Sequence, residues 1–132
     1  AVARGIDPGP ACDEVVRGTL ADVPDDACDV AVACDVIEHV EDDAGFLAGL
    51  MRVARVGVFF STPNYRWEWA RCQNPHHVRE YTPEELHLML RYLDCDFWMS
   101  GVDLVPRRIP SLWYADEHPN FGVWIHHRGR LV

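Results

Sequence analysis

The stretch Asp29-Val30-Ala31-Val32-Ala33-Cys34-Asp35-Val36-Ile37-Glu38-His39-Val40 decides the fold that the sequence predicts. Residues 30–34 form a continuous apolar run, which is typical of a parallel strand buried on both faces. An acidic turn with one histidine follows the run directly. We therefore expect a strand in the centre of a sheet, with polar side chains at its carboxyl end.

A helix and another strand follow this run at short spacing. Residues 41–43 are acidic, and negative charge is favourable at a helix N-terminus. Apolar residues recur at helical spacing over 46–54, and residues 56–60 form a second apolar run that ends at 61–64. Strand, helix and strand with short connections make a βαβ unit, which requires a parallel pair and a right-handed crossover.

The rest of the chain continues the alternation of short strands and helices. Residues 2–6 and 15–16 are candidate strands before the central run, and Thr82-Pro83-Glu84-Glu85 has the pattern of a capping box that begins a second helix. Two last strands, 97–102 and 121–126, flank a proline-rich stretch over 105–119. We expect an α/β fold with a mostly parallel sheet, flanking helices and one domain over 1–132, its binding crevice outside the carboxyl ends of the strands.

Composition restricts the classes of partner. The 132 residues carry a net charge of -9, and all 12 basic residues are arginine. An acidic protein is not held to nucleic acid by bulk electrostatics, although a local basic site is compatible with this charge. No apolar run approaches the roughly 18 residues of a membrane span, so no membrane partner is expected. Five cysteines without a CxxC pair favour reduced thiols and a cytoplasmic location.

The turn after the central run carries the first candidate site. If the chain becomes helical at Asp35, then Asp35, Glu38 and His39 lie on one helical face. Two carboxylates and an imidazole can bind a divalent cation, or the carboxylates can orient the histidine as a general base. The same residues can also simply cap and pack a βα turn, and spacing alone leaves these readings open.

Three blocks of sequence, in this order, carry a resemblance to a known family. They are residues 29–40, the segment Ser61-Thr62-Pro63-Asn64, and Asn74-Pro75-His76-His77-Val78-Arg79-Glu80-Tyr81-Thr82-Pro83-Glu84-Glu85-Leu86. Together they strongly resemble the class I S-adenosylmethionine-dependent methyltransferases, from about Gly5 to the last strand. The resemblance implies a Rossmann-like fold, S-adenosyl-L-methionine (SAM) as cofactor, and transfer of its methyl group to an unidentified small-molecule or nucleic-acid acceptor.

The resemblance also implies roles for particular residues. Asp7 would bind the cofactor's ribose, Thr19 and Leu20 would border its adenine, and Cys34 and Asp35 would border its methionine end. The catalytic residues would be His39, Glu38 and His77. In a subset of relatives a comparable segment binds a divalent metal, so Asp35, Glu38, His39 and His77 form an alternative metal set.

One part of the family pattern is missing from the sequence. Members have a first strand and a glycine-rich turn before the acid matched by Asp7, and no GxGxG occurs anywhere in this sequence. The domain therefore looks incomplete at the N-terminus. The chain is a fragment, or the second family strand pairs directly with the fourth, or a second chain completes the fold. The competing hypothesis is a non-catalytic module derived from a methyltransferase, which does not bind the cofactor alone.

The acceptor side of the predicted site is less determined. Residues 64–71 alternate aromatic and charged side chains, as a lid over a planar or anionic acceptor would, or as a surface segment whose tryptophans pack on the body. Arg66, Arg71 and Arg79 could form a local acceptor site within the acidic chain. A small molecule is the expected acceptor.

Overall fold

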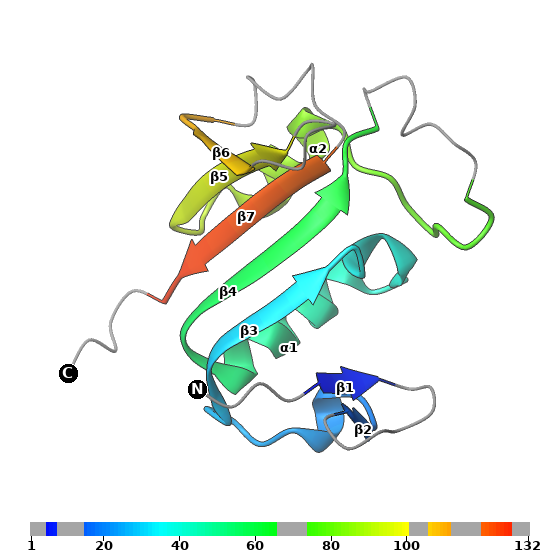
Figure 1. Cartoon of the computed structure of the whole chain (residues 1–132), viewed down its shortest axis with the longest axis vertical. Helices are drawn as coiled ribbons and strands as arrows, with labels where there is room; N and C mark the ends of the chain where they lie inside the picture. Colours follow the sequence, from blue (N-terminus) through cyan, green and yellow to red (C-terminus); the bar gives the residue numbers. More distant parts are fainter. Residues whose placement is uncertain (1–4, 8–14, 66–73, 101–105, 112–119, 128–132) are drawn as a thin grey trace.

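The computed structural model describes residues 5–7, 15–65, 74–100, 106–111 and 120–127. Its main feature is a five-stranded sheet in the order β3-β4-β7-β5-β6 (Figure 1). The strands are β3 (Cys28–Cys34), β4 (Ala54–Pro63), β7 (Asn120–His126), β5 (Cys95–Ser100) and β6 (Pro106–Ile109). The pair β3–β4 is parallel and the other three pairs are antiparallel. The sheet is therefore mixed, with β3, β4 and β5 running in one direction.

The predicted βαβ unit is confirmed, with helix α1 (Asp43–Val53) connecting β3 to β4. Asp42 is the N-cap, and its carboxylate accepts a hydrogen bond from the Gly45 amide at 2.9 Å. Such a cap satisfies one of the free amides of the first turn. Leu47, Leu50 and Val53 are buried against the sheet.

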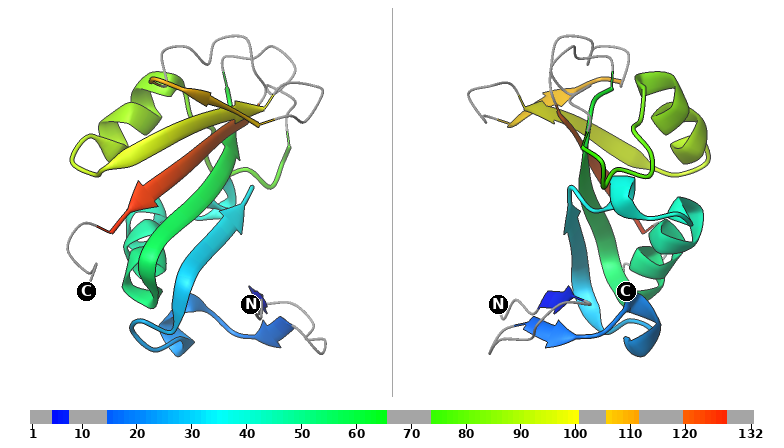
Figure 2. Two further views of the ribbon diagram at one scale, coloured as in Figure 1. Left: turned by 60° about the vertical axis from the view of Figure 1, so that its left-hand side comes forward. Right: turned by 90° about the vertical axis from the view of Figure 1, so that its right-hand side faces the viewer.

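The second predicted helix is also confirmed as α2 (Pro83–Leu90). Thr82 and Glu85 form the expected reciprocal capping box, and Pro83 occupies the first turn. Both helices lie on the same face of the sheet (Figure 2). The core lies between the two helices and the inward side chains of the strands. It includes Leu86 from α2 and Phe60 and Val123 from the strands.

Strands β1 (Gly5–Asp7) and β2 (Val15–Arg17) form a separate parallel pair. A 3₁₀ turn, η1 (Leu20–Asp22), follows β2 and is fixed to α1 by Arg52, which donates hydrogen bonds to the carbonyls of Leu20 and Val23 at 2.7 and 2.8 Å. Neither β1 nor β2 pairs with the five-stranded sheet. Direct pairing of the second family strand, β1, with the fourth, β3, is therefore not observed.

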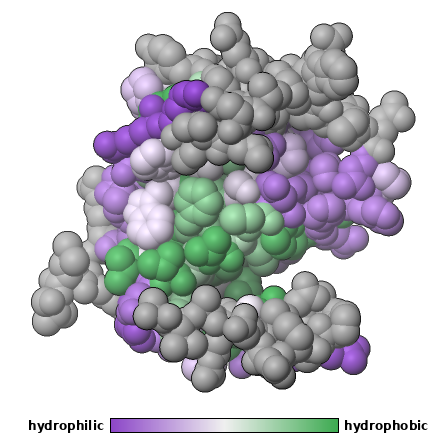
Figure 3. All heavy atoms as spheres, in the orientation of Figure 1, coloured by the Kyte–Doolittle hydropathy of each residue, from purple (hydrophilic) through white to green (hydrophobic). Residues whose placement is uncertain are grey.

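The prediction that residues 30–34 form a central strand buried on both faces is wrong. Strand β3 lies at the edge of the sheet, because no described strand pairs with its outer side. Ala31 and Ala33 face the core, whereas Val30 and Val32 are 39% and 63% exposed. Apolar side chains are correspondingly visible on the face of the molecule shown in Figure 3. A continuous apolar run suits a strand that is covered on both faces, whereas both described helices lie on one face of this sheet (Figure 2).

One strand is longer than the sequence predicts, and another was not expected at all. Strand β4 continues to Pro63 because Ser61, Thr62 and Pro63 still pair with β7. Strand β6 lies within the proline-rich stretch that was not expected to form a strand. It is an edge strand that begins at Pro106, and such positions tolerate a proline.

Candidate functional site

A group of buried polar side chains lies where β3 and β4 end. Glu38 is 1% exposed, and Thr62 and Asn64 are 0% exposed. The Thr62 hydroxyl donates a hydrogen bond to Glu38 Oε2 at 3.1 Å. Glu38 Oε1 is buried and has no hydrogen-bond partner among the described residues. A buried carboxylate oxygen without a donor is unfavourable for the fold, so Glu38 is a candidate for a functional role.

Burial also changes the protonation of Glu38. Desolvation raises the pKa of Glu38, and hydrogen bonds from its own backbone amide and from Thr62 oppose the shift. The negative charge of Asp35 adds to the rise in the pKa of Glu38, and His39 acts against it. The side chain therefore holds a proton more tightly than an exposed glutamate does.

The helical placement expected for Asp35 is wrong. Asp35 has a φ of 52°, in the left-handed region that aspartate tolerates better than most residues, and the 3₁₀ turn η2 (Ile37–His39) begins only after Val36. The Asp35 amide donates to the Ser61 carbonyl at 3.1 Å, and the Ser61 hydroxyl donates to Asp35 Oδ1 at 2.8 Å. The carboxylate is thus attached to β4 and does not share a helical face with Glu38 and His39.

Two histidines meet beside Glu38. The rings of His39 and His77 lie 4.8 Å apart between centroids in an edge-to-face arrangement. His39 Nδ1 lies 2.9 Å from the His76 carbonyl oxygen, and His77 Nδ1 lies 3.1 Å from Glu80 Oε1. A carbonyl and a carboxylate accept, so each Nδ1 acts as the donor, which leaves Nε2 as the acceptor of a ring that carries one proton.

His77 reaches this place on the segment of residues 74–81, which we call the strap. The amides of Val78 and Arg79 both donate to the Glu38 carbonyl, at 2.9 and 3.1 Å. The far end of the strap is joined to the end of β4, where the Tyr65 amide donates to the Tyr81 carbonyl at 3.0 Å. Residues distant in sequence, Glu38 and His77, are thereby brought together.

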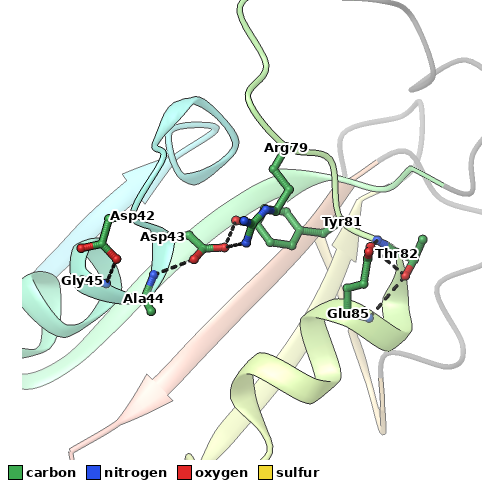
Figure 4. A network of polar contacts seen from close by, with 8 residues as sticks. All are labelled: Asp42, Asp43, Ala44, Gly45, Arg79, Tyr81, Thr82 and Glu85. Carbon is green, nitrogen blue, oxygen red and sulfur yellow. Dashed lines mark hydrogen bonds and ion pairs between the residues drawn. The ribbon is translucent and has the colours of Figure 1, made fainter.

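Arg79 pairs with a residue that no sequence pattern indicated. The Arg79 guanidinium donates to Asp43 Oδ2, and the Tyr81 hydroxyl donates to the same oxygen at 2.9 Å (Figure 4). Arg79 is therefore paired with the first turn of α1, although its side chain is 51% exposed. The other two residues of the predicted acceptor site, Arg66 and Arg71, lie outside the described residues, as does most of the predicted lid.

The residues expected around the cofactor lie at the ends of strands. Asp7 is the last residue of β1 and is in register with Arg17, the last residue of β2. The backbone and hydroxyl of Thr19 donate to Asp22 at 2.8 and 3.0 Å, and the backbone bond is the larger cause of the lowered pKa of Asp22. Leu20 packs partly buried against the core, and Cys34 is exposed at the end of β3.

The residues present fit a SAM-type cofactor in part. The ribose and adenine candidates share one end of the β1–β2 pair, and Cys34 is accessible at the end of β3. The glycine-rich turn that would let the backbone approach the cofactor closely is absent from the sequence. For a divalent cation, the donor set is Glu38, His39 and His77, whose ligand atoms all lie within 4.8 Å of one another.

Residues 3–62 match the methyltransferase domain family. A Mycolicibacterium smegmatis protein named "probable S-adenosylmethionine-dependent methyltransferase" is 39% identical over 85 residues, which cover 58% of this chain and 33% of that protein. A SAM-dependent methyltransferase from Thermotoga maritima superimposes with a TM-score of 0.65 at 14% identity, covering 85% of this chain and 63% of the other. The chain therefore has the fold of class I SAM-dependent methyltransferases, and the resemblance found in the sequence is confirmed.

A further similar structure is a complex of two proteins. It is described as a complex of the Haloferax volcanii Trm112 methyltransferase activator with "the putative methyltransferase". A chain of this complex matches with a TM-score of 0.60 at 14% identity, and the match covers 96% of this chain and 72% of the other. The chain spans a third, 33%, of the length of the curated relative it matches. No helix in the described part of the chain is long and apolar enough to cross a membrane.

Proposed function

We propose that this chain acts in the transfer of a methyl group from SAM to an acceptor molecule. The observation that carries the proposal is that residues 3–62 match the methyltransferase domain family and contain every candidate cofactor-binding and catalytic residue except His77. SAM supplies an electrophilic methyl group on a sulfonium, so the protein needs no nucleophile of its own. Its residues bind and orient the reactants, which is sufficient for an in-line displacement.

Each candidate residue has a distinct task in this proposal. Asp7 accepts hydrogen bonds from the ribose hydroxyls, Thr19 and Leu20 border the adenine, and Cys34 and Asp35 border the methionine end. Nε2 of His39 or His77 accepts the proton that the acceptor group loses, because each Nδ1 is held as a donor by a neighbouring oxygen. Glu38 stabilises the positive charge that then develops on the imidazole.

The test is equilibrium binding of S-adenosylhomocysteine, the demethylated product, to the chain and to Asp7→Ala. Loss of hydrogen bonds to a charged group costs about 1.5–3 kcal/mol, so Asp7→Ala should weaken binding roughly tenfold or more. Asp25→Ala is the matched control, since Asp25 forms an ion pair with Arg52 and is not in the candidate site. Equal affinities of Asp7→Ala and the unmodified chain would remove Asp7 from the site.

A divalent cation at Glu38, His39 and His77 is a second candidate for this site. The unpartnered, buried Oε1 of Glu38 and the two available Nε2 atoms favour it, and a bound cation would hold an acceptor hydroxyl and lower its pKa. Asp35, the fourth ligand in the sequence-based set, is hydrogen-bonded to Ser61 instead. Adding Mn²⁺ should broaden the NMR signals of His39 and His77 before those of His126. Equal broadening of all three would argue against the site.

The open edge of β3 favours a second chain that completes the sheet. Val30 and Val32 are exposed beside an edge that no described strand covers, and such an edge can pair with another strand. We propose a second copy of the chain as the occupant to be tested first, by sedimentation over a range of concentrations. Self-association that Val32→Asp abolishes would support it, and a monomer at every concentration would contradict it.

The remaining assignments complete the proposal. The acceptor is a small molecule, and the chain works as one domain. The location is cytoplasmic, and the free thiols of Cys28, Cys34 and Cys95 support this location. The alternative is a non-catalytic module that does not bind the cofactor alone. A folded chain that binds no S-adenosylhomocysteine would favour that alternative.

A further inference from the structure

The carboxylate of Asp43 accepts hydrogen bonds from three donors, which come from two parts of the chain. The Ala44 amide donates to Oδ1 at 2.8 Å, and Arg79 and the Tyr81 hydroxyl both donate to Oδ2 (Figure 4). Asp43 is 9% exposed and Tyr81 is 2% exposed. Burial, and to a lesser degree Asp43, raise the pKa of Tyr81, so its hydroxyl keeps its proton and remains a donor.

Asp43 is not needed to cap α1. That task is performed by Asp42, which accepts from the Gly45 amide at 2.9 Å. The two side-chain donors to Asp43 both come from the strap, at positions 79 and 81. A largely buried carboxylate is costly unless it is paired, so the Asp43 side chain is best explained by its contacts with the strap.

The strap is held at its contact with Glu38 and again immediately beyond it. The amides at 78 and 79 bind the Glu38 carbonyl, and Arg79 and Tyr81 bind Asp43 immediately beyond. His77 lies one residue before the first of these anchors and four before the last, and its ring centroid lies 4.8 Å from that of His39. Without the Asp43 contacts, the position of His77 would rest on the amide bonds to the Glu38 carbonyl and on the contact of the His76 carbonyl with His39, and the His77 ring would be less firmly held against His39.

We propose that Asp43, Arg79 and Tyr81 are positioning residues that hold the strap so that His77 faces His39 beside Glu38. The inference rests on the proposed function, because it gives these three residues the task of assembling the end of the site where the methyl group is transferred. None of the three is required to touch cofactor or acceptor. Their effect passes through the strap.

The experiment measures the contact between the two histidine rings directly. The nuclear Overhauser effect between the imidazole protons of His39 and His77 is recorded in the ligand-free chain and in Arg79→Met, Arg79→Lys and Tyr81→Phe. Arg91→Met is the matched control, because Arg91 is an exposed arginine whose guanidinium binds the Leu88 carbonyl. Signals from the paired residues Val58 and Ile125 report whether the sheet is intact.

The expected result is loss of the signal between the rings in Arg79→Met, a weaker signal in Tyr81→Phe, and a retained signal in Arg79→Lys and Arg91→Met, all with an intact sheet. A role limited to stability would lower the melting temperature and leave the signal unchanged. Full intensity in both Arg79→Met and Tyr81→Phe would overturn the proposal. If Arg79→Met does not fold, Tyr81→Phe, which removes a single oxygen, decides. The measurement needs no cofactor, so its failure is distinguishable from failure of the chain to bind S-adenosylhomocysteine.

Discussion

Replacement of Glu38 by glutamine should make the protein more stable at neutral and alkaline pH. The variant keeps the acceptor for the Thr62 hydroxyl and removes the charge from a side chain that is 1% exposed. Leaving a buried charged oxygen without a partner costs on the order of 1–3 kcal/mol, and each unit of pKa shift corresponds to about 1.4 kcal/mol. We expect Glu38→Gln to raise the free energy of unfolding at pH 8 by about 1–3 kcal/mol.

The sign of the pH dependence follows from the raised pKa of Glu38. The folded protein binds this proton more tightly than the unfolded chain, so stability from Glu38 is greatest below the unfolded pKa of about 4.3 and is lost as the pH rises through the folded pKa. The advantage of the variant should therefore be absent near pH 4 and complete at pH 8. Urea unfolding at both pH values measures it, with the exposed Glu41→Gln as control. A variant less stable at pH 8, or a gain independent of pH, would refute the reasoning.

Three further predictions concern the fold and its thiols. Gly57→Ala should destabilise the protein by about 1–3 kcal/mol in urea unfolding, because the new Cβ would lie 2.7 Å from the Ile125 carbonyl oxygen. Gly49→Ala in α1, whose new Cβ would lie nearest to Leu20 Cδ1, at 3.1 Å, is the control, and an equal loss there would contradict the explanation. Thr82→Ala should lose about 1 kcal/mol by removing the cap of α2, whereas Thr82→Ser should lose much less. Burial raises the pKa of Cys95 to about 11, so iodoacetamide at pH 8 should modify the exposed Cys34 before Cys95, and the reverse order would be evidence against the described packing.

Local patterns predicted the local structure of this chain well. The acidic cluster before residue 46 became a capped helix, and the capping box at Thr82 began α2 where expected. Both signals act between residues a few positions apart, so the sequence contains all the information needed to recognise them. The parallel pair β3–β4 followed from the short connection through one helix.

Features that depend on distant residues were predicted poorly. The apolar residues 30–34 indicated a central strand, but which strands flank β3 depends on residues far from it in the sequence. The acid at position 43 was interpreted only as favourable charge for a helix, whereas it also binds Arg79 and Tyr81, 36 and 38 residues away. The left-handed turn at Asp35, which separates its carboxylate from Glu38, has no clear signal in the sequence.

Titration calorimetry of the chain with S-adenosylhomocysteine tests the central claim most directly. The proposed function predicts a saturable heat of binding for the unmodified, folded chain, with one ligand bound per chain. A well-folded chain that gives no heat, and shows no other sign of binding at millimolar ligand, would contradict the claim that this polypeptide forms a cofactor site.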